Sequence, residues 1–194
     1  EANLSIGVCL DVPIYSHCSN FKGTIDDLRL YNVSLKSWQF NQLSNPQSFA
    51  EKASDIDAKS KHLMGHWPFN GNADDSSDNQ NQGNLISGEF VADREGNPSS
   101  ALYLDGVDDH VVIPHSESLN PVDQLSVSMW LKIDEFTNTW SPIIHKGGSY
   151  VNNGFNREYS LFLKSNSNIY LTSAGNSKGQ ILHTLSSPKA KWFH

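Results

Sequence analysis

The stretch Leu125-Ser-Val-Ser-Met-Trp-Leu-Lys-Ile133 is the clearest indication of how this chain folds. Five apolar residues alternate along it with Ser126, Ser128, Trp130 and Lys132. Successive side chains of an extended strand point to opposite faces, so a period of two places the five apolar residues on one face. The stretch therefore predicts a β-strand that buries one face against a core.

Short runs of the same kind recur along most of the chain. Residues 159–163 and 168–172 are two such runs, joined by the turn-forming segment Lys164-Ser-Asn-Ser167, which is typical of a hairpin. Many short strands at a spacing of roughly ten residues, with Gly, Asn and Ser between them, favour a β-sandwich or a barrel. The further runs are residues 23–31, 101–104, 110–113, 180–184 and 191–194.

The composition describes a packed, acidic protein. The 194 residues include 14 Lys and Arg against 21 Asp and Glu, a net charge of −7, and 10% are aromatic. Such an aromatic content is typical of a folded core rather than of a disordered acidic segment. The negative balance argues against general nucleic-acid binding, which needs a basic surface. No stretch approaches the roughly 18 apolar residues of a membrane span, and residue 1 opens no signal peptide, so we expect any targeting segment to lie outside this sequence.

Residues 36–62 interrupt the strand pattern. Between residues 34 and 63 there is no alternation and little β-branched content. Residues 35–43 predict a short helical turn region. Ser48-Phe-Ala-Glu51 has the form of a capping box and predicts a helix over residues 49–61, with Asn45-Pro46 separating the two. We interpret residues 36–62 as a helical linker.

The chain contains two cysteines, Cys9 and Cys18, separated by eight residues. Pro13 lies between them and could turn the chain back, so we predict a disulfide, with two reduced thiols as the alternative. A disulfide and a surface rich in serine and asparagine favour an oxidising compartment. We therefore expect an extracellular or cell-surface location.

Three motifs resemble a known family. Phe21-Lys-Gly-Thr-Ile-Asp-Asp-Leu-Arg-Leu-Tyr-Asn32 looks like the closing strand of a laminin-G-like domain of the concanavalin A-like lectin/glucanase superfamily. Gly65-His-Trp-Pro-Phe-Asn-Gly-Asn-Ala-Asp-Asp-Ser-Ser77 looks like its opening, and Ala101-Leu-Tyr-Leu-Asp-Gly-Val-Asp-Asp-His-Val-Val-Ile113 like its next hairpin. The resemblance implies an all-β fold, a jelly-roll β-sandwich of two antiparallel sheets.

The order of these motifs is unusual, because the closing motif precedes the opening motif. Residues 1–35 look like the C-terminal strands of one sandwich and residues 63–194 like the N-terminal and central strands of another. A window cut from a tandem array explains this order, and a circular permutation is the alternative. In either case we expect residues 1–35 to pack as strands into the sandwich of residues 63–194, in the same chain or in a neighbouring copy.

The resemblance also implies a structural calcium ion that bridges the opening loop to the closing strand. Matching positions assign Asn72 and Asp75 of the loop and Asp26 of the closing strand as ligands, and Asp78 as a possible addition. Carboxylate and amide oxygens are the ligands that Ca²⁺ takes. The alternative is that these residues are solvated turn formers. A second acidic turn contains Asp105, Asp108 and Asp109. We interpret these residues first as formers of the hairpin turn.

Carbohydrate binding is the function we predict. Trp140, Tyr150, Asn153 and Arg157 lie in or beside a polar, aromatic, loop-like stretch that suits the rim of a lectin. An aromatic ring can stack on a sugar, while amide and charged groups bond its hydroxyls. The alternative for Trp140 is that it only packs against the edge of the sandwich. The expected partner is a glycan or cell-surface polysaccharide, and neighbouring repeats or other protein chains are further possible partners.

The sequence favours a non-catalytic module. It has no strand with the alternating Glu and Asp residues of a glucanase, no His-Glu-x-x-His motif and no Gly-x-Ser-x-Gly elbow. We therefore predict a calcium-stabilised, lectin-like module of an exported multi-domain protein. The alternative is a structural or adhesive spacer repeat that contacts other proteins and has no small-ligand site.

Overall fold

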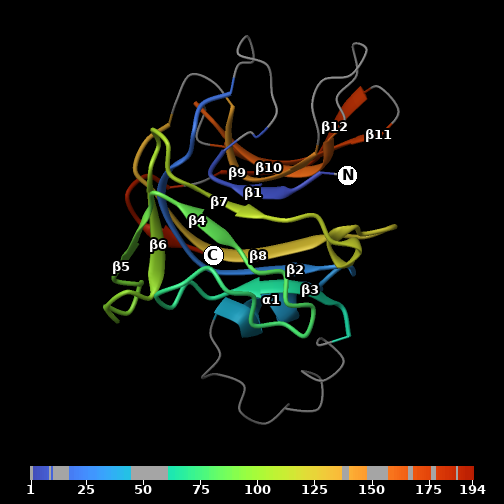
Figure 1. Ribbon diagram of the computed structural model, residues 1–194. Helices are drawn as coiled ribbons and strands as arrows, with labels where there is room; N and C mark the ends of the chain where they lie inside the picture. The colour runs from blue at the N-terminus through green and yellow to red at the C-terminus, as the bar shows by residue number, and fades with distance from the viewer. Residues whose placement is uncertain are drawn as a thin grey trace.

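Two antiparallel β-sheets face each other in the computed structural model (Figure 1). It describes residues 2–8, 10, 18–44, 61–136, 140–147, 157–165, 168–175, 178–186 and 188–194. One sheet has seven strands in the order β12-β11-β10-β9-β1-β7-β4. The other has six, in the order β13-β8-β2-β6-β5 with β3 also paired to β2. The predicted jelly-roll sandwich is confirmed.

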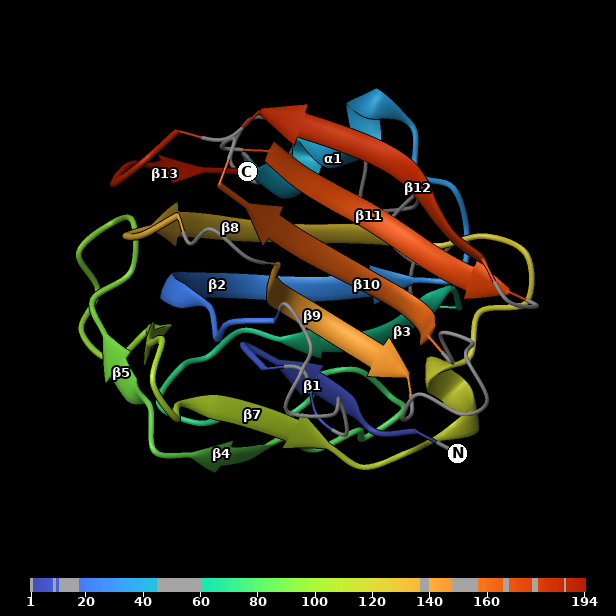
Figure 2. The ribbon, with the colours of Figure 1, turned by 90° about the horizontal axis from the view of Figure 1, so that it is seen from above.

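The seven-stranded sheet is viewed face-on in Figure 2. Its strands are β1 (Leu4–Ile6), β4 (Asn84–Ile86), β7 (His110–Ile113), β9 (Ser141–Gly147), β10 (Arg157–Lys164), β11 (Asn168–Gly175) and β12 (Lys178–Ser186). The six-stranded sheet consists of β2 (Lys22–Tyr31), β3 (Leu63–Trp67), β5 (Glu89–Val91), β6 (Ala101–Asp105), β8 (Ser126–Ile133) and β13 (Trp192–Phe193). A 3₁₀ turn, η2 (Glu117–Leu119), and the helix α1 (Ser37–Ser44) complete the described elements.

Residues 1–35 supply a strand to each sheet. β1 lies between β7 and β9, with Leu4 opposite Ile113 on one side and Lys146 on the other. β2 lies in the middle of the second sheet, with β8 on one side and β6 and β3 on the other. The prediction that residues 1–35 pack as strands into the sandwich of residues 63–194 is thereby confirmed within a single chain.

The core lies between the two sheets and is apolar. Met129, Leu131 and Ile133 of β8 are buried there, as the alternation of residues 125–133 predicts. Trp67 of β3 is fully buried, and its ring lies over Gly65, where a Cβ atom would stand 2.3 Å from the ring. Glycine at position 65 is therefore what allows the largest side chain of the core to lie flat.

The central strand β2 carries a β-bulge at Asp26 and Asp27. Its register against β8 shifts between Asp26 and Arg29, and Asp27 has a φ of 55°. After Ile25, the next residue of β2 that faces the core is Leu28 and not residue 27, because the bulge inserts one extra residue. Both aspartates are thus placed in the middle of a sheet without entering the core.

The connector is only partly described. α1 agrees with the predicted short helical region and lies on the outer side of the six-stranded sheet (Figure 1). The helix predicted over residues 49–61 falls almost wholly outside the described residues. Cys18 is disulfide-bonded, and its predicted partner Cys9 also lies outside them. In the described part of the chain, no helix combines the length and apolarity that a membrane crossing requires.

Candidate functional site

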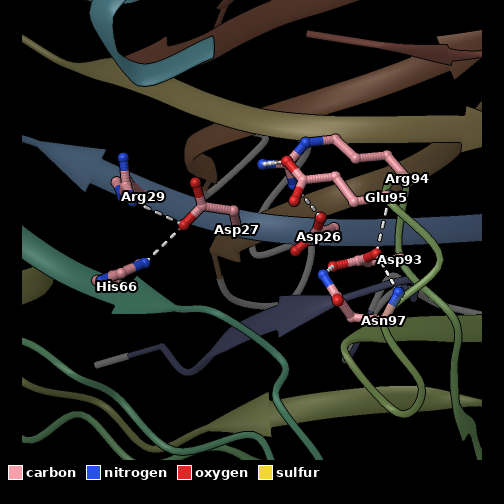
Figure 3. A network of polar contacts seen from close by, with 8 residues as sticks. All are labelled: Asp26, Asp27, Arg29, His66, Asp93, Arg94, Glu95 and Asn97. Atoms are coloured by element: carbon pink, nitrogen blue, oxygen red, sulfur yellow. Dashed lines mark hydrogen bonds and ion pairs between the residues drawn. The ribbon is translucent and has the colours of Figure 1, made fainter. Parts of the chain in front are cut away.

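Polar side chains gather on the face of the six-stranded sheet that points away from the core (Figure 3). They come from two neighbouring strands and from residues 92–100, which connect β5 to β6. We call this group the outer-face network. Its members are Asp26, Asp27, Arg29, His66, Asp93, Arg94, Glu95 and Asn97.

Asp27 organises one half of the network. Its Oδ1 atom is 2.9 Å from Nη2 of Arg29 and 2.7 Å from Nε2 of His66. The bulge turns this carboxylate toward β3, while that of Asp26 points the other way (Figure 3). Docking of β2 against β3 therefore creates an Asp-His-Arg group that the separate motifs did not predict.

Asp26 and Arg94 form the other half. Asp26 is only 4% exposed and pairs with the guanidinium of Arg94. Burial raises the pKa of Asp26 to about 6, although Arg94 acts to lower it. The guanidinium also lies over the ring of Trp130, 4.7 Å from its centroid, in a cation–π contact.

The network continues past Trp130 to Ser128 of β8 and to His194, the residue that follows β13. The rings of Trp130 and His194 have centroids 5.3 Å apart, and Nε2 of His194 lies 2.9 Å from Oγ of Ser128. Burial lowers the pKa of His194. Aromatic, cationic and anionic groups are thus packed side by side on this face, an environment in which perturbed pKa values are expected.

Asp75 organises the opening loop by hydrogen bonds. Its Oδ1 accepts the backbone N–H groups of His66 and Ser77, and its Oδ2 accepts the N–H of Asn81 and the hydroxyl of Ser77, all at 2.8 Å. Asn72 accepts the N–H of Asp74 at 3.1 Å and is exposed, as is Asp78. Of the four predicted calcium ligands, Asp26 and Asp75 are buried, and each already has partners from this chain.

The carboxylate oxygens of Asp105, Asp108 and Asp109 lie within 4.8 Å of one another. This group could hold a metal ion. It also has the predicted hairpin role, since Asp109 accepts the N–H groups of Gly88 and Asp105 at 2.7 and 2.9 Å. Burial raises the pKa of Asp109. The exposed Asp108 is the member whose side chain is most open to an ion from solvent.

Trp140 is the described member of the predicted carbohydrate rim. Its half-buried ring meets Phe162 and Tyr170 edge-on, with centroids 5.7 and 5.3 Å apart, and Nζ of Lys164 lies 4.5 Å from its centroid. Arg157 begins β10, where its backbone pairs with Gly147. Tyr150 and Asn153, the remaining members of the predicted rim, lie outside the described residues.

A row of aromatic and polar side chains runs from Trp140 along β9 and β10. The rings of Phe162 and His145 have centroids 6.0 Å apart, and Nδ1 of His145 lies 2.8 Å from Oγ of Ser160. Phe162 contacts both Trp140 and His145, so aromatic and polar groups form one row. The half-buried end of this row consists of Trp140, Tyr170 and Lys164.

These features define the class of protein: an antiparallel sandwich of two sheets whose outward faces carry polar side chains. Comparison with known proteins agrees: residues 105–194 match a laminin-G-like family model described as the concanavalin A-like lectin/glucanases superfamily. The match therefore agrees with the family resemblance of the motifs and extends it to residues 105–194. Neither the curated proteins nor the solved structures yielded a match.

Proposed function

We propose that this chain is a non-catalytic carbohydrate-binding module of an exported, multi-domain protein. The observation that supports this most directly is the aromatic end of the row on β9–β11. A half-buried tryptophan beside a tyrosine and a lysine offers a flat apolar surface next to polar groups, the combination that ligand sites use. All three residues lie within the part that matches the lectin and glucanase superfamily.

Lys164 has a defined role in this proposal. Its ammonium group lies over the Trp140 ring and covers part of the surface on which a sugar would stack. A lysine side chain has a long flexible stem and three donors. On binding, it would move aside and donate hydrogen bonds to sugar hydroxyls, so that the ring and the ammonium act on the same ligand.

Replacing Trp140 by alanine is expected to weaken glycan binding at least about tenfold, the equivalent of about 1.4 kcal/mol. The measurement is a glycan array, followed by titration calorimetry with the best glycan. Trp38→Ala is the matched control, because Trp38 is an exposed tryptophan, 42% accessible, on α1. Circular dichroism would verify that both variants fold. Equal affinities for the wild type and Trp140→Ala contradict the site, and no glycan binding at all favours the spacer function.

We propose calcium as the ion for the acidic turn of Asp105, Asp108 and Asp109. Oxygen-only ligands favour a hard cation. An ion that binds only the folded state, at a hundredfold excess over its Kd, stabilises that state by about 2.7 kcal/mol. Chelation is therefore expected to lower the Tm by about 5–11 °C in a chain of this size.

Asp108→Asn is expected to abolish this response to chelation. The variant leaves the turn hydrogen bonds of Asp105 and Asp109 in place, so it tests the ion rather than the hairpin. Asp123→Asn, at another exposed acidic residue, is the control. Differential scanning calorimetry in EDTA and in calcium chloride is the measurement. The same calcium response in Asp108→Asn as in the wild type would place the ion elsewhere.

A further inference from the structure

The two buried carboxylates to which the family resemblance assigns calcium are Asp26 and Asp75. Asp75 has little capacity left for a metal ion. An ionised carboxylate offers about four acceptor positions, and four donors already occupy those of Asp75. Three of these donors are backbone N–H groups of β3 and the opening loop. The loop is therefore held against β3 by hydrogen bonds to one carboxylate.

The negative charge of the Asp26 carboxylate is balanced by the side chain of Arg94. Arg94 pairs with it, and the arginine side chain is 19% exposed while that of Asp26 is 6% exposed. The charged groups around Asp26 are Asp27 on β2, Asp93 and Arg94 on the connection between β5 and β6, and Glu95, which is 3.7 Å from Arg94. Arg94 is the cation that reaches this carboxylate.

Contacts within the chain hold Arg94 in position. Oδ1 of Asp93 accepts the backbone N–H groups of Glu95 and Asn97 at 2.8 and 2.9 Å, and Oδ2 accepts Nδ2 of Asn97 at 2.9 Å. These bonds fix the turn that carries Arg94. The ring of Trp130 supports the other side of the guanidinium. A planar, permanently charged group fixed in this way can bridge two elements as a bound cation does.

We infer that Arg94 supplies the positive charge that calcium was expected to supply at the closing strand, so that β2 is held to the connection between β5 and β6 by an ion pair within the chain and needs no metal ion there. The guanidinium joins β2 to the connection between β5 and β6, and Asp75 independently joins the opening loop to β3. This inference goes beyond the proposed function, because it assigns the closure of the sandwich to protein groups whatever the module binds.

The test uses the Asp108→Asn protein as its parent, so that the acidic turn contributes no calcium response. Melting temperatures are measured in EDTA and in calcium chloride for this parent and for the parent carrying Arg94→Met, Arg94→Lys or Glu95→Gln. Arg94→Met is expected to lower the Tm by about 5 °C, equally in both solutions. Arg94→Lys should recover part of the loss. Glu95→Gln should leave the Tm nearly unchanged, because Glu95 is 66% exposed and its 3.7 Å ion pair with Arg94 is screened by solvent.

Calcium titration calorimetry on the same parent gives a second readout that needs no destabilised variant. We expect no binding heat, and no change in Tm when calcium is added. Calcium binding that Asp26→Asn or Asp75→Asn abolishes would overturn the inference, and so would an Arg94→Met variant as stable as its parent. If Arg94→Met fails to fold, the calorimetry and the Arg94→Lys variant still decide. Glycan binding is not measured here, so failure of the proposed function would leave these outcomes unaffected.

Discussion

Asp75→Ala is expected to lower the free energy of unfolding by about 3–5 kcal/mol, one of the largest effects of any single substitution in this chain. The carboxylate is 6% exposed and accepts four hydrogen bonds. Removing it leaves the buried N–H group of Asn81 and the partly buried N–H groups of His66 and Ser77 without an acceptor. Each unsatisfied buried donor costs about 1–3 kcal/mol, and relaxation of the loop recovers part of that sum.

Urea unfolding followed by tryptophan fluorescence would measure this loss. Asp74→Ala is a close control, because Asp74 is the adjacent, exposed carboxylate. It should change the free energy of unfolding by less than about 0.5 kcal/mol. The loss in Asp75→Ala should be the same in EDTA and in calcium. A loss that appears only when calcium is present would mean that Asp75 acts through a metal ion instead of through these hydrogen bonds.

Asp26→Asn is expected to change how stability depends on pH. Burial raises the pKa of Asp26 from its usual 3.8 to about 6 in the folded protein. Between these two values the folded state holds a proton that the unfolded state has released. The resulting stabilisation is fully present below about pH 3.8 and is lost as the pH rises through about 6. Its full size is about 3 kcal/mol.

The comparison of interest is the difference between the wild type and Asp26→Asn, because other acidic groups titrate in both. Asparagine imitates the protonated carboxyl and does not titrate, so the stability of the variant relative to the wild type should rise by about 3 kcal/mol between pH 4 and pH 7. Unfolding free energies from urea titrations across this range would measure the difference. Asp74→Asn, at an exposed position, should follow the wild type. Parallel curves for the wild type and Asp26→Asn would mean that Asp26 is ionised normally in the folded state.

The strands were predicted best where alternation is long. β8 covers Ser126–Ile133 within the predicted residues 125–133, because each apolar side chain of that run faces the core. β4 and β5 were not predicted, since each has three residues and a period of two is not visible over that length. The bulge in β2 has a trace in the sequence: the apolar residues Ile25 and Leu28 are separated by two aspartates instead of one residue.

The candidate site was predicted less completely. Asp26 and Asp75 were predicted as calcium ligands from the family resemblance, and Trp140 was predicted as a rim aromatic from the polar, loop-like stretch around it. Asp27 and Arg94 were missed. Asp27 becomes important only through the bulge, and Arg94 lies in a turn with no periodic pattern, 68 residues from the carboxylate that it contacts.

The longer strands and their buried faces could be predicted from the sequence, because alternating apolar side chains must be removed from water together. The packing of residues 1–35 with residues 63–194 followed from the family resemblance of the motifs. Which charges meet depends on the folded structure. Ion pairs such as Asp26 with Arg94 and Asp27 with His66 depend on the register of neighbouring strands and on the path of one connection. Coulomb attraction acts between side chains that packing has already brought close, so no local pattern in the sequence records it.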